Sequence, residues 1–269
     1  MTVFKRIICM ILVLCMVMSL CACGSAGYGV NTVQTLVEQD YYLAFRNNDL
    51  TYYYLTAAIS VLAAHGRVDE LSTKWLGSPK LNFAKKADAL EILQPPESRD
   101  LVIGIDANSF PMAYESNGEY WGLDIELALA ACELLDWKLS IHPIEKENVY
   151  IELSSGNIDC AWGGIAIDEK TVKSNRFTTY GPYIHNDIII ATRNGSAVWN
   201  KLRLSGKRMC MCSTPEAMDA LNADPSLAKK LGQITRLAGG TTECFQNMYA
   251  GKCDVILTDS TAAMYFNCH

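Results

Sequence analysis

The amino-acid sequence predicts an α/β protein with two similar lobes, and three observations support this fold class. From Leu101 onward, apolar strands alternate with helical segments, which is typical of parallel-rich sheets. One pattern occurs twice: "IELSSGNIDCAWGG" and "FQNMYAGKCDVILTD" each read as helix, glycine, two residues, aspartate, apolar strand and polar loop. The 269 residues, half of them hydrophobic, suit one large domain or two modest ones, with enough chain for their cores. Because open α/β sheets bind ligands beyond the carboxyl ends of their strands, two facing lobes predict a cleft.

The first 23 residues differ from the rest of the chain. Lys5 and Arg6 precede an apolar run, Ile7 to Leu20, as in an export signal, and this run is shorter than the ~20 residues that span a bilayer. The formal charge of −6 and the lack of a basic run argue against nucleic-acid binding. Seven cysteines follow Cys23, with neither CxxC nor Cys/His spacing. We expect mostly buried thiols, leave a disulfide open, and expect no metal or cofactor.

The segment before Leu101 reads differently from the alternating part. "TVQTLVEQDYYLAFRN" predicts two short strands, and "NDLTYYYLTAAISVLAAHG" predicts a helix that Asp49 caps and Gly66 ends. "VDELSTKWLG" predicts a second helix by its apolar spacing. Residues 78–98 read as a linker with one short helix, Phe83 to Leu93, which the following prolines halt. Taken alone, these elements cannot enclose a core.

The alternating part divides into two units. In the first, "LVIGID" and "IDCAW" are expected strands, each followed by a loop. The segment "GLDIELALAACELLDW" is an expected helix that Asp124 caps, with Leu129 on its apolar face. The second unit begins near Ile188, and its strand "KRMCMC" runs into a helix start marked by Thr214 as cap and Pro215 at the first position.

These segments resemble the extracytoplasmic solute-binding proteins of amino-acid ABC importers, which have the type II periplasmic-binding-protein fold. The resemblance extends over nearly all of the mature chain, and its landmarks are "IGIDANSFPMAY", "GLDIELALA", "SGNIDCAWGG", "YGPYIHNDIIIATR", "GKRMCMC" and "GKCDVILTDS". The resemblance implies two lobes that close on a hinge around a small ligand. "LCAC", ending at Cys23, is similar to a lipobox, in which this thiol receives a diacylglycerol; an ordinary cleaved signal peptide or an uncleaved anchor is the alternative.

The order of the segments differs from that family. There the sequence normally ends with a return strand, a helix and a tail, whereas here the same material, "DYYLAFRNNDLTYYYLTAAISVLAAHGRVDELSTKWLG", precedes the first strand. We therefore expect a circular permutant, because domain termini usually lie close together on the surface. A remnant of two tandem binding domains is the alternative. In a permutant, Leu55, Ile59, Leu62 and Trp75 should pack against the lobe that begins at Leu101.

The expected organisation follows from this order. It comprises a lipoprotein signal peptide (1–22), a tether plus a strand of the second lobe (23–38), the return strand and helices of the first lobe (39–77), a linker joining the ancestral termini (78–98), the rest of the first lobe (99–184) and the second lobe (185–269).

The resemblance also implies ligand-binding residues in the loops beyond the strands. Asp259 matches the acid that accepts an α-ammonium, or it caps the next helix instead. Asp106 reaches a polar or cationic ligand group, or it caps its own turn. Phe110 walls the ligand or fills a core, and Trp162 stacks on the ligand or fills the lobe interface. The other expected ligand contacts are Ser109, Gly163, Gly164, Ala166, Thr171, Ser213 and Thr214.

Two departures concern the carboxylate of an amino-acid ligand. Thr171 stands where the family usually has an arginine, and threonine cannot supply a bidentate fork. In the second carboxylate cradle Pro215 removes an N–H donor and Glu216 adds a negative charge. Lys170 or Lys173 is a nearby candidate to compensate. We therefore expect either a ligand other than a standard free α-amino acid, or weak binding.

The resulting functional expectation is a monomeric protein outside the cell, lipid-anchored to the bacterial membrane. It would close around a small polar solute, an amino acid or a relative, and deliver it to an ABC permease. No GxSxG, HExxH, Walker or dinucleotide motif is present, so an enzyme is not expected. The alternatives are a ligand sensor without transport and a dehydratase-like enzyme on the same fold, with Asp106 and Asp259 as its candidates.

Overall fold

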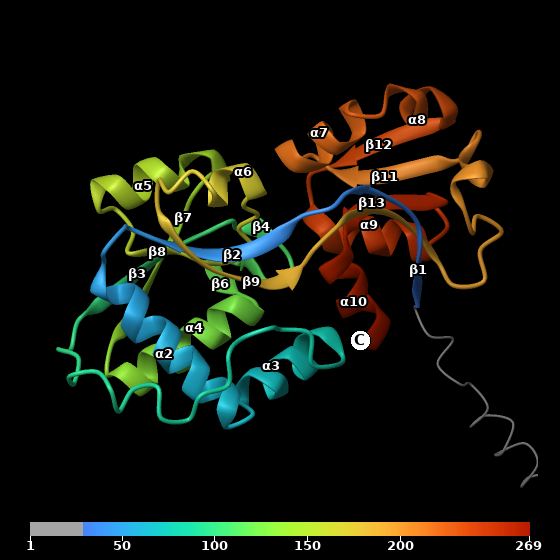
Figure 1. Ribbon diagram of the computed structural model, residues 1–269. Coiled ribbons are helices and arrows are strands. Elements are labelled where there is room, and N and C mark those ends of the chain that lie inside the picture. The colour runs from blue at the N-terminus through green and yellow to red at the C-terminus, as the bar shows by residue number, and fades with distance from the viewer. Residues whose placement is uncertain (1–28) are drawn as a thin grey trace, which may run out of the picture.

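Two five-stranded sheets form the centres of two lobes (Figure 1). The computed structural model describes residues 29–269, so the expected signal peptide and Cys23 lie outside the described residues. In spatial order the first sheet contains β7 (Lys138–Pro143), β3 (Asp100–Ile105), β8 (Cys160–Ala161), β2 (Asp40–Phe45) and β9 (Thr178–His185). The second contains β1 (Val30–Val37), β10 (Ile188–Arg193), β13 (Val255–Asp259), β11 (Arg208–Cys212) and β12 (Gln233–Leu237). The predicted two-lobed α/β fold is confirmed.

The two sheets share one topology. In each, three neighbouring strands are parallel (β7-β3-β8 and β12-β11-β13), the fourth strand (β2 or β10) is antiparallel to them, and the fifth (β9 or β1) reverses again. The aspartates of the recurring sequence pattern occupy equivalent places. Asp159 accepts a hydrogen bond from the backbone N of Val102 in β3, and Asp254 accepts one from the backbone N of Arg208 in β11, each at 2.9 Å. The repeated pattern therefore ties two parallel strands together in each lobe.

Helices cover both faces of the two sheets (Figure 1). The first lobe has α2 (Leu50–Ala64), α3 (Arg67–Leu76), α4 (Leu123–Leu135), α5 (Val149–Ser155) and α6 (Glu169–Val172), together with a small sheet of β4 (Asn108–Ser109), β5 (Ala113–Ser116) and β6 (Glu119–Trp121). The second lobe has α7 (Pro215–Asn222), α8 (Pro225–Lys230), α9 (Gly240–Tyr249) and α10 (Ser260–Cys268). The predicted caps of α2 and α7 are confirmed: Asp49 accepts from Thr51 N at 2.8 Å, and Thr214 accepts from Ala217 N at 3.3 Å.

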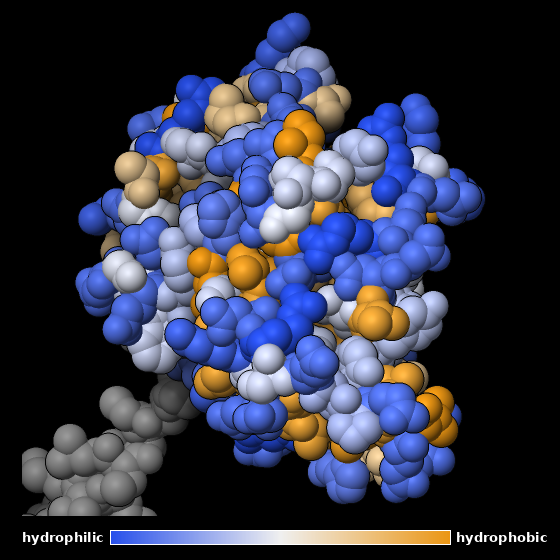
Figure 2. Space-filling model, turned by 90° about the vertical axis from the view of Figure 1, so that its left-hand side faces the viewer, coloured by the Kyte–Doolittle hydropathy of each residue, from blue (hydrophilic) through white to orange (hydrophobic). Residues whose placement is uncertain are grey.

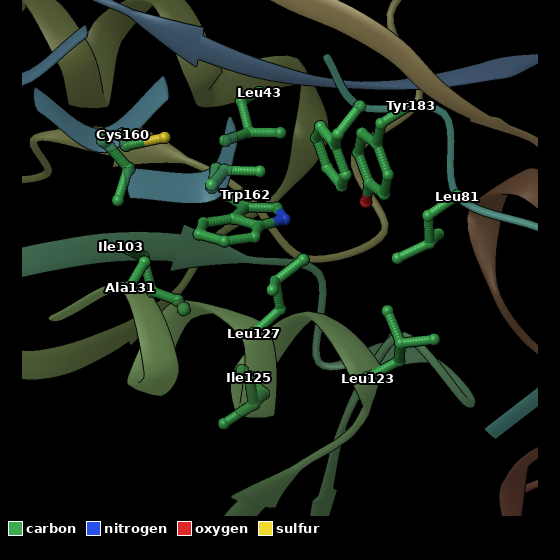
Figure 3. Packing of buried hydrophobic residues seen from close by; sticks show 14 of the residues in the cluster. Leu43, Leu81, Ile103, Leu123, Ile125, Leu127, Ala131, Cys160, Trp162 and Tyr183 are labelled. Carbon is green, nitrogen blue, oxygen red and sulfur yellow. The ribbon is translucent and has the colours of Figure 1, made fainter. Parts of the chain in front are cut away.

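The opening elements belong to the first lobe. Leu55, Ile59 and Trp75 lie in the same buried cluster as Leu101, and Leu62 packs against its edge, as predicted. Strand β2 lies inside the sheet between β8 and β9. In the close view of the core, Leu43 of β2 lies beside Trp162, and Leu127 of α4 lies on the other side of that ring (Figure 3). The N-terminal segment therefore completes a core that the later elements begin, while circular permutation stays a prediction.

Three expectations about helices are wrong. Residues 83–93 form no helix: residues 83–86 have no regular structure and residues 87–92 form turns. Backbone hydrogen bonds from Asn82 N to the carbonyl of Tyr183 and from Lys86 N to that of Ser60 hold this strap against the lobe. Asp124 does not cap α4; the cap position is Gly122, and Asp124 lies inside the first turn, fully buried. Leu129 is 48 % exposed, because the adjacent positions of α4 face the core.

The face of the molecule on the left-hand side of Figure 1 is mostly hydrophilic, with hydrophobic residues in small separate patches (Figure 2). Over residues 29–269, no helix combines the length and the apolar character that crossing a bilayer requires.

Candidate functional site

Two neighbouring segments connect the lobes. Residues 38–39 join β1 to β2, and residues 186–187 join β9 to β10, so each crossing runs from one sheet into the other. The two crossings lie side by side in Figure 1, and the backbone N of Asn186 donates to the carbonyl of Gln39 at 2.9 Å. Paired crossings of this kind act as a hinge about which two rigid lobes can open and close.

A small cavity lies between the lobes at the carboxyl ends of strands from both sheets, with a volume of about 40 Å³. This volume holds only a few water-sized groups, so the lobes stand close together. Of the predicted ligand residues, Asp106, Ser109, Gly164, Ala166, Thr214 and Asp259 line it. The remaining lining residues are Gln39, Tyr41, Asn108, Lys146, Ile188, Cys212, Glu216, Ala217, Thr241, Leu257 and Thr258.

Asp259 ends β13 and occupies the cap position of α10, but its side chain makes no capping hydrogen bond. Its carboxylate instead accepts from Asn186 Nδ2 at 2.8 Å. Burial raises the pKa of Asp259 to about 6, and the negative charge of Glu216 adds to the rise. The carboxylate can therefore bind a cavity occupant, and a positive charge on that occupant would stabilise its ionised form.

Asp106 follows β3 and combines both expected roles. It accepts from the backbone N of Asn108 at 2.9 Å, which closes its turn, and it also lines the cavity. Burial raises the pKa of Asp106 to about 6, with Glu216 and Asp259 contributing by charge repulsion. The first and second lobes therefore each contribute one carboxyl group that is costly to ionise.

Asn186, in the hinge, joins the two sides of the cavity through hydrogen bonds that sequence reasoning missed. Its Nδ2 donates to Tyr41 Oη at 2.7 Å as well as to Asp259, and its Oδ1 accepts from the Thr261 hydroxyl at 2.9 Å. Tyr41 in turn lies 3.1 Å from Ser109 Oγ. This buried chain of hydrogen bonds runs from the first lobe to the second and fixes the position of Asp259.

An ion pair also crosses the cleft. Lys146 Nζ, in the short 3-10 helix Lys146–Asn148 of the first lobe, lies 2.9 Å from Glu216 Oε1 in α7 of the second. Both residues line the cavity. No sequence signal distinguished Lys146 from a solvated lysine, because its partner lies seventy residues away along the chain.

Gly164 and Asp124 build the wall of the cavity on the first lobe. Gly164 has a φ of +67°, and a Cβ atom there would lie 1.9 Å from Ser109 Oγ, so only glycine fits. Its N–H donates to Asp124 Oδ2 at 3.0 Å, and the same oxygen accepts from Tyr183 Oη at 2.6 Å. Burial raises the pKa of Asp124 to about 7. Asp124 therefore neither caps α4 nor contacts a ligand. It is a positioning residue that holds Gly164 and Tyr183 behind the cavity.

Two predicted aromatic contacts do not line this cavity. Trp162 is fully buried in the first lobe, where its ring lies between side chains of β2 and α4 (Figure 3). It lies in the core because side chains of β2 and α4 pack against it. Phe110 lines an adjoining cavity and packs against Tyr114 and Tyr265, with ring centroids 4.9 and 4.8 Å away. Its ring fills a contact between the lobes.

Three other predicted contacts also lie off the cavity. Gly163 backs onto Ile105, where a Cβ atom would come within 2.7 Å. The Thr171 hydroxyl donates to Asp168, the cap residue of α6, at 2.6 Å, so Thr171 stabilises the first turn of that helix. Ser213 is exposed to solvent. The lysines that could have replaced an arginine here, Lys170 and Lys173, are exposed, and Lys173 pairs with Glu169.

Cys210 and Cys212 share one buried face of β11, as alternate strand positions predict. All seven cysteines within residues 29–269 are free thiols, six buried and Cys268 exposed. Over the same range, no group of His, Cys, Asp and Glu side chains has the arrangement of a metal site.

A cavity enclosed by the strand ends of two like lobes, hinged on two adjacent segments, defines a two-lobed solute-binding protein. The chain belongs to the bacterial extracellular solute-binding proteins, family 3, whose family model matches residues 101–239. It is similar to the probable amino-acid-binding protein YxeM of Bacillus subtilis (strain 168), with 28% identity over 94 residues, which are 35% of this chain and 36% of that protein. The chain thus spans about a third of the length of this curated relative.

Two solved structures are also similar. One is a polar amino acid ABC uptake transporter substrate-binding protein from Streptococcus thermophilus, 26% identical, covering 60% of this chain and 61% of that chain with a TM-score of 0.45. The other is an ABC uptake transporter substrate-binding protein from Streptococcus pneumoniae with bound histidine, 22% identical, covering 62% of this chain and 68% of that chain with a TM-score of 0.47.

Proposed function

We propose that this protein captures a small polar solute, an amino acid or a relative of one, outside the cell and delivers it to an ABC permease. The observation that carries the proposal is the cavity between the lobes, to which each lobe contributes a carboxylate beside a hinge of two segments. Family membership supports the extracellular role. Lipid attachment at Cys23 would keep the protein at the membrane that holds the permease.

Calorimetry with a panel of amino acids and their derivatives tests capture. We expect one binding site per chain, a raised melting temperature and a smaller radius of gyration in X-ray scattering when the lobes close. Asp259→Ala should abolish binding, whereas Asp219→Ala, at an exposed position of α7, should not. If no member of the panel binds, capture of amino acids and their relatives is refuted. Uptake assays in cells with and without the permease then separate transport from sensing.

An enzyme on the same fold is the second candidate, and one observation favours it. Asp106 and Asp259 have pKa values of about 6 in a shared cavity, which suits proton transfer near neutrality. Product formation from prephenate or arogenate would identify a dehydratase, and Asp106→Asn should then abolish turnover.

We further propose that the chain is a circular permutant of its family. Support comes from the ends of the described chain, because Val30 N donates to Asn267 Oδ1 at 2.6 Å and Asn267 Nδ2 donates back to Val30 O at 3.3 Å. A variant that joins His269 to Gly29 by a short linker and opens the chain within residues 78–98 should fold with similar stability and the same ligand profile. An unfolded product would contradict the proposal.

A further inference from the structure

More acidic than basic side chains line the cavity. Its lining includes the carboxylates of Asp106, Asp259 and Glu216, and Lys146 is the one basic residue among the lining residues. Lys146 is already paired with Glu216 at 2.9 Å. Two carboxylates therefore remain, one from each lobe, without a cationic partner. Holding such groups together away from water costs free energy unless an occupant supplies positive charge.

Two backbone donors of the same lining are already bound within the protein. The N–H of Gly164 is already bound to Asp124, and the N–H of Ala217 is bound to the Thr214 hydroxyl. Pro215, at the start of α7, has no N–H, and the carboxylate of Glu216 follows it. A carboxylate in this cavity would therefore meet like charge, and the backbone N–H groups of Gly164 and Ala217 could not bind it without giving up their present acceptors.

A second observation, independent of the charges, indicates that a polar occupant completes the cavity. Thr258 lines the cavity and is only 8% exposed, yet within residues 29–269 its hydroxyl oxygen has no hydrogen-bond partner. Thr258 directly precedes Asp259 in β13, and its hydroxyl can either donate or accept a hydrogen bond. A buried polar atom without a partner is costly, so a polar group of a ligand that reached this hydroxyl would relieve that cost.

We propose that the ligand is a small dication without a carboxylate, of the short-chain diamine class, with one ammonium group at Asp106 and the other at Asp259. This inference rests on the proposed function, since it assigns the substrate class of the same cavity. Each ammonium forms a charge-assisted hydrogen bond with the carboxylate of one lobe, so a single molecule links both lobes and favours their closed arrangement. The cavity of about 40 Å³ excludes a long carbon chain, and the lobes must open to admit even a short one.

Matched ligand pairs test the inference, because 1,4-diaminobutane is ornithine without its carboxylate and 1,5-diaminopentane is lysine without its carboxylate. In calorimetry at neutral pH we expect each diamine to bind at least roughly tenfold more tightly than the matching amino acid. Asp106→Asn and Asp259→Asn should each weaken diamine binding by a similar factor. Tighter binding of ornithine and lysine, or binding of a neutral amino acid without the diamines, overturns the inference and leaves the proposed function standing. A protein that binds none of these solutes overturns both.

Glu216→Gln supplies an internal control on the charge argument. The substitution removes one negative charge and frees Lys146, which then becomes available to a ligand carboxylate. The preference for 1,4-diaminobutane over ornithine should therefore fall several-fold relative to the natural chain. Glu126→Gln, which breaks the pair of Lys74 and Glu126 within the first lobe, should leave the preference unchanged. An unchanged preference in Glu216→Gln would overturn the proposed role of the cavity charges.

Discussion

Replacing Asp259 by asparagine should stabilise the ligand-free protein at neutral pH while it weakens ligand binding. The amide oxygen of asparagine can still accept from Asn186 Nδ2, so the contact seen at 2.8 Å is kept and only the charge is lost. The pKa of this carboxyl rises from 3.8 to about 6 in the folded protein. Between these two pH values the folded chain holds a proton that the unfolded chain has released. Stability therefore falls as pH rises through this window and is constant above it.

The size of the effect follows from the pKa. A rise from 3.8 to about 6 corresponds to ~3 kcal/mol of unfolding free energy at about 1.4 kcal/mol per tenfold change. Asp259 is partly exposed to the cavity, so water screens its charge, and we expect a gain of ~1 to 2 kcal/mol above about pH 7.

Urea unfolding of both proteins from about pH 4 to pH 8 measures the difference. The two curves should converge at the acid end and separate toward neutrality. Asp219→Asn, which removes the same charge from an exposed position, controls for net charge. A difference between Asp259→Asn and the natural chain that does not change with pH would refute the reasoning, as would an equal gain in the control.

Three further predictions concern the cavity wall and the cleft. Asp124→Ala leaves two buried donors without an acceptor, so urea unfolding should show a loss of ~3 kcal/mol, and a loss below ~1 kcal/mol would contradict this. Gly164→Ala places a methyl carbon 1.9 Å from Ser109 Oγ, so calorimetry should detect no ligand binding; unchanged affinity would mean that the loop can move aside. Lys146→Gln removes the ion pair across the cleft, so X-ray scattering should show a more open ligand-free protein. Lys74→Gln, within one lobe, should leave the scattering unchanged, and equal effects would exclude a role for the cleft pair.

Features encoded within a few neighbouring residues could be predicted from the sequence. Asp49 and Thr214 cap their helices through backbone N–H groups only two or three residues away. The recurring Gly-x-x-Asp pattern correctly indicated two like lobes. Asp159 and Asp254 each accept a hydrogen bond from the backbone of the neighbouring parallel strand, at equivalent places in the two sheets.

The site depends on contacts that no local pattern contains. Asn186 donates a hydrogen bond to Tyr41, which lies 145 positions away in the chain, and the sequence around neither residue predicts this contact. Trp162 carries a signal that is ambiguous in principle, because a tryptophan after a strand can turn toward a cleft or toward a core. The packing of β2 and α4, elements far from it in the sequence, decides for the core.

Strand β1 is the outermost strand of the second sheet, and this has a mechanical consequence. Along the chain, β1 belongs to the second lobe and is joined to the first lobe only through the hinge segment 38–39. A chain held from its leading end would thus keep Asp259 and Glu216 stationary, and the half that swings would carry Asp106 and Lys146 toward them.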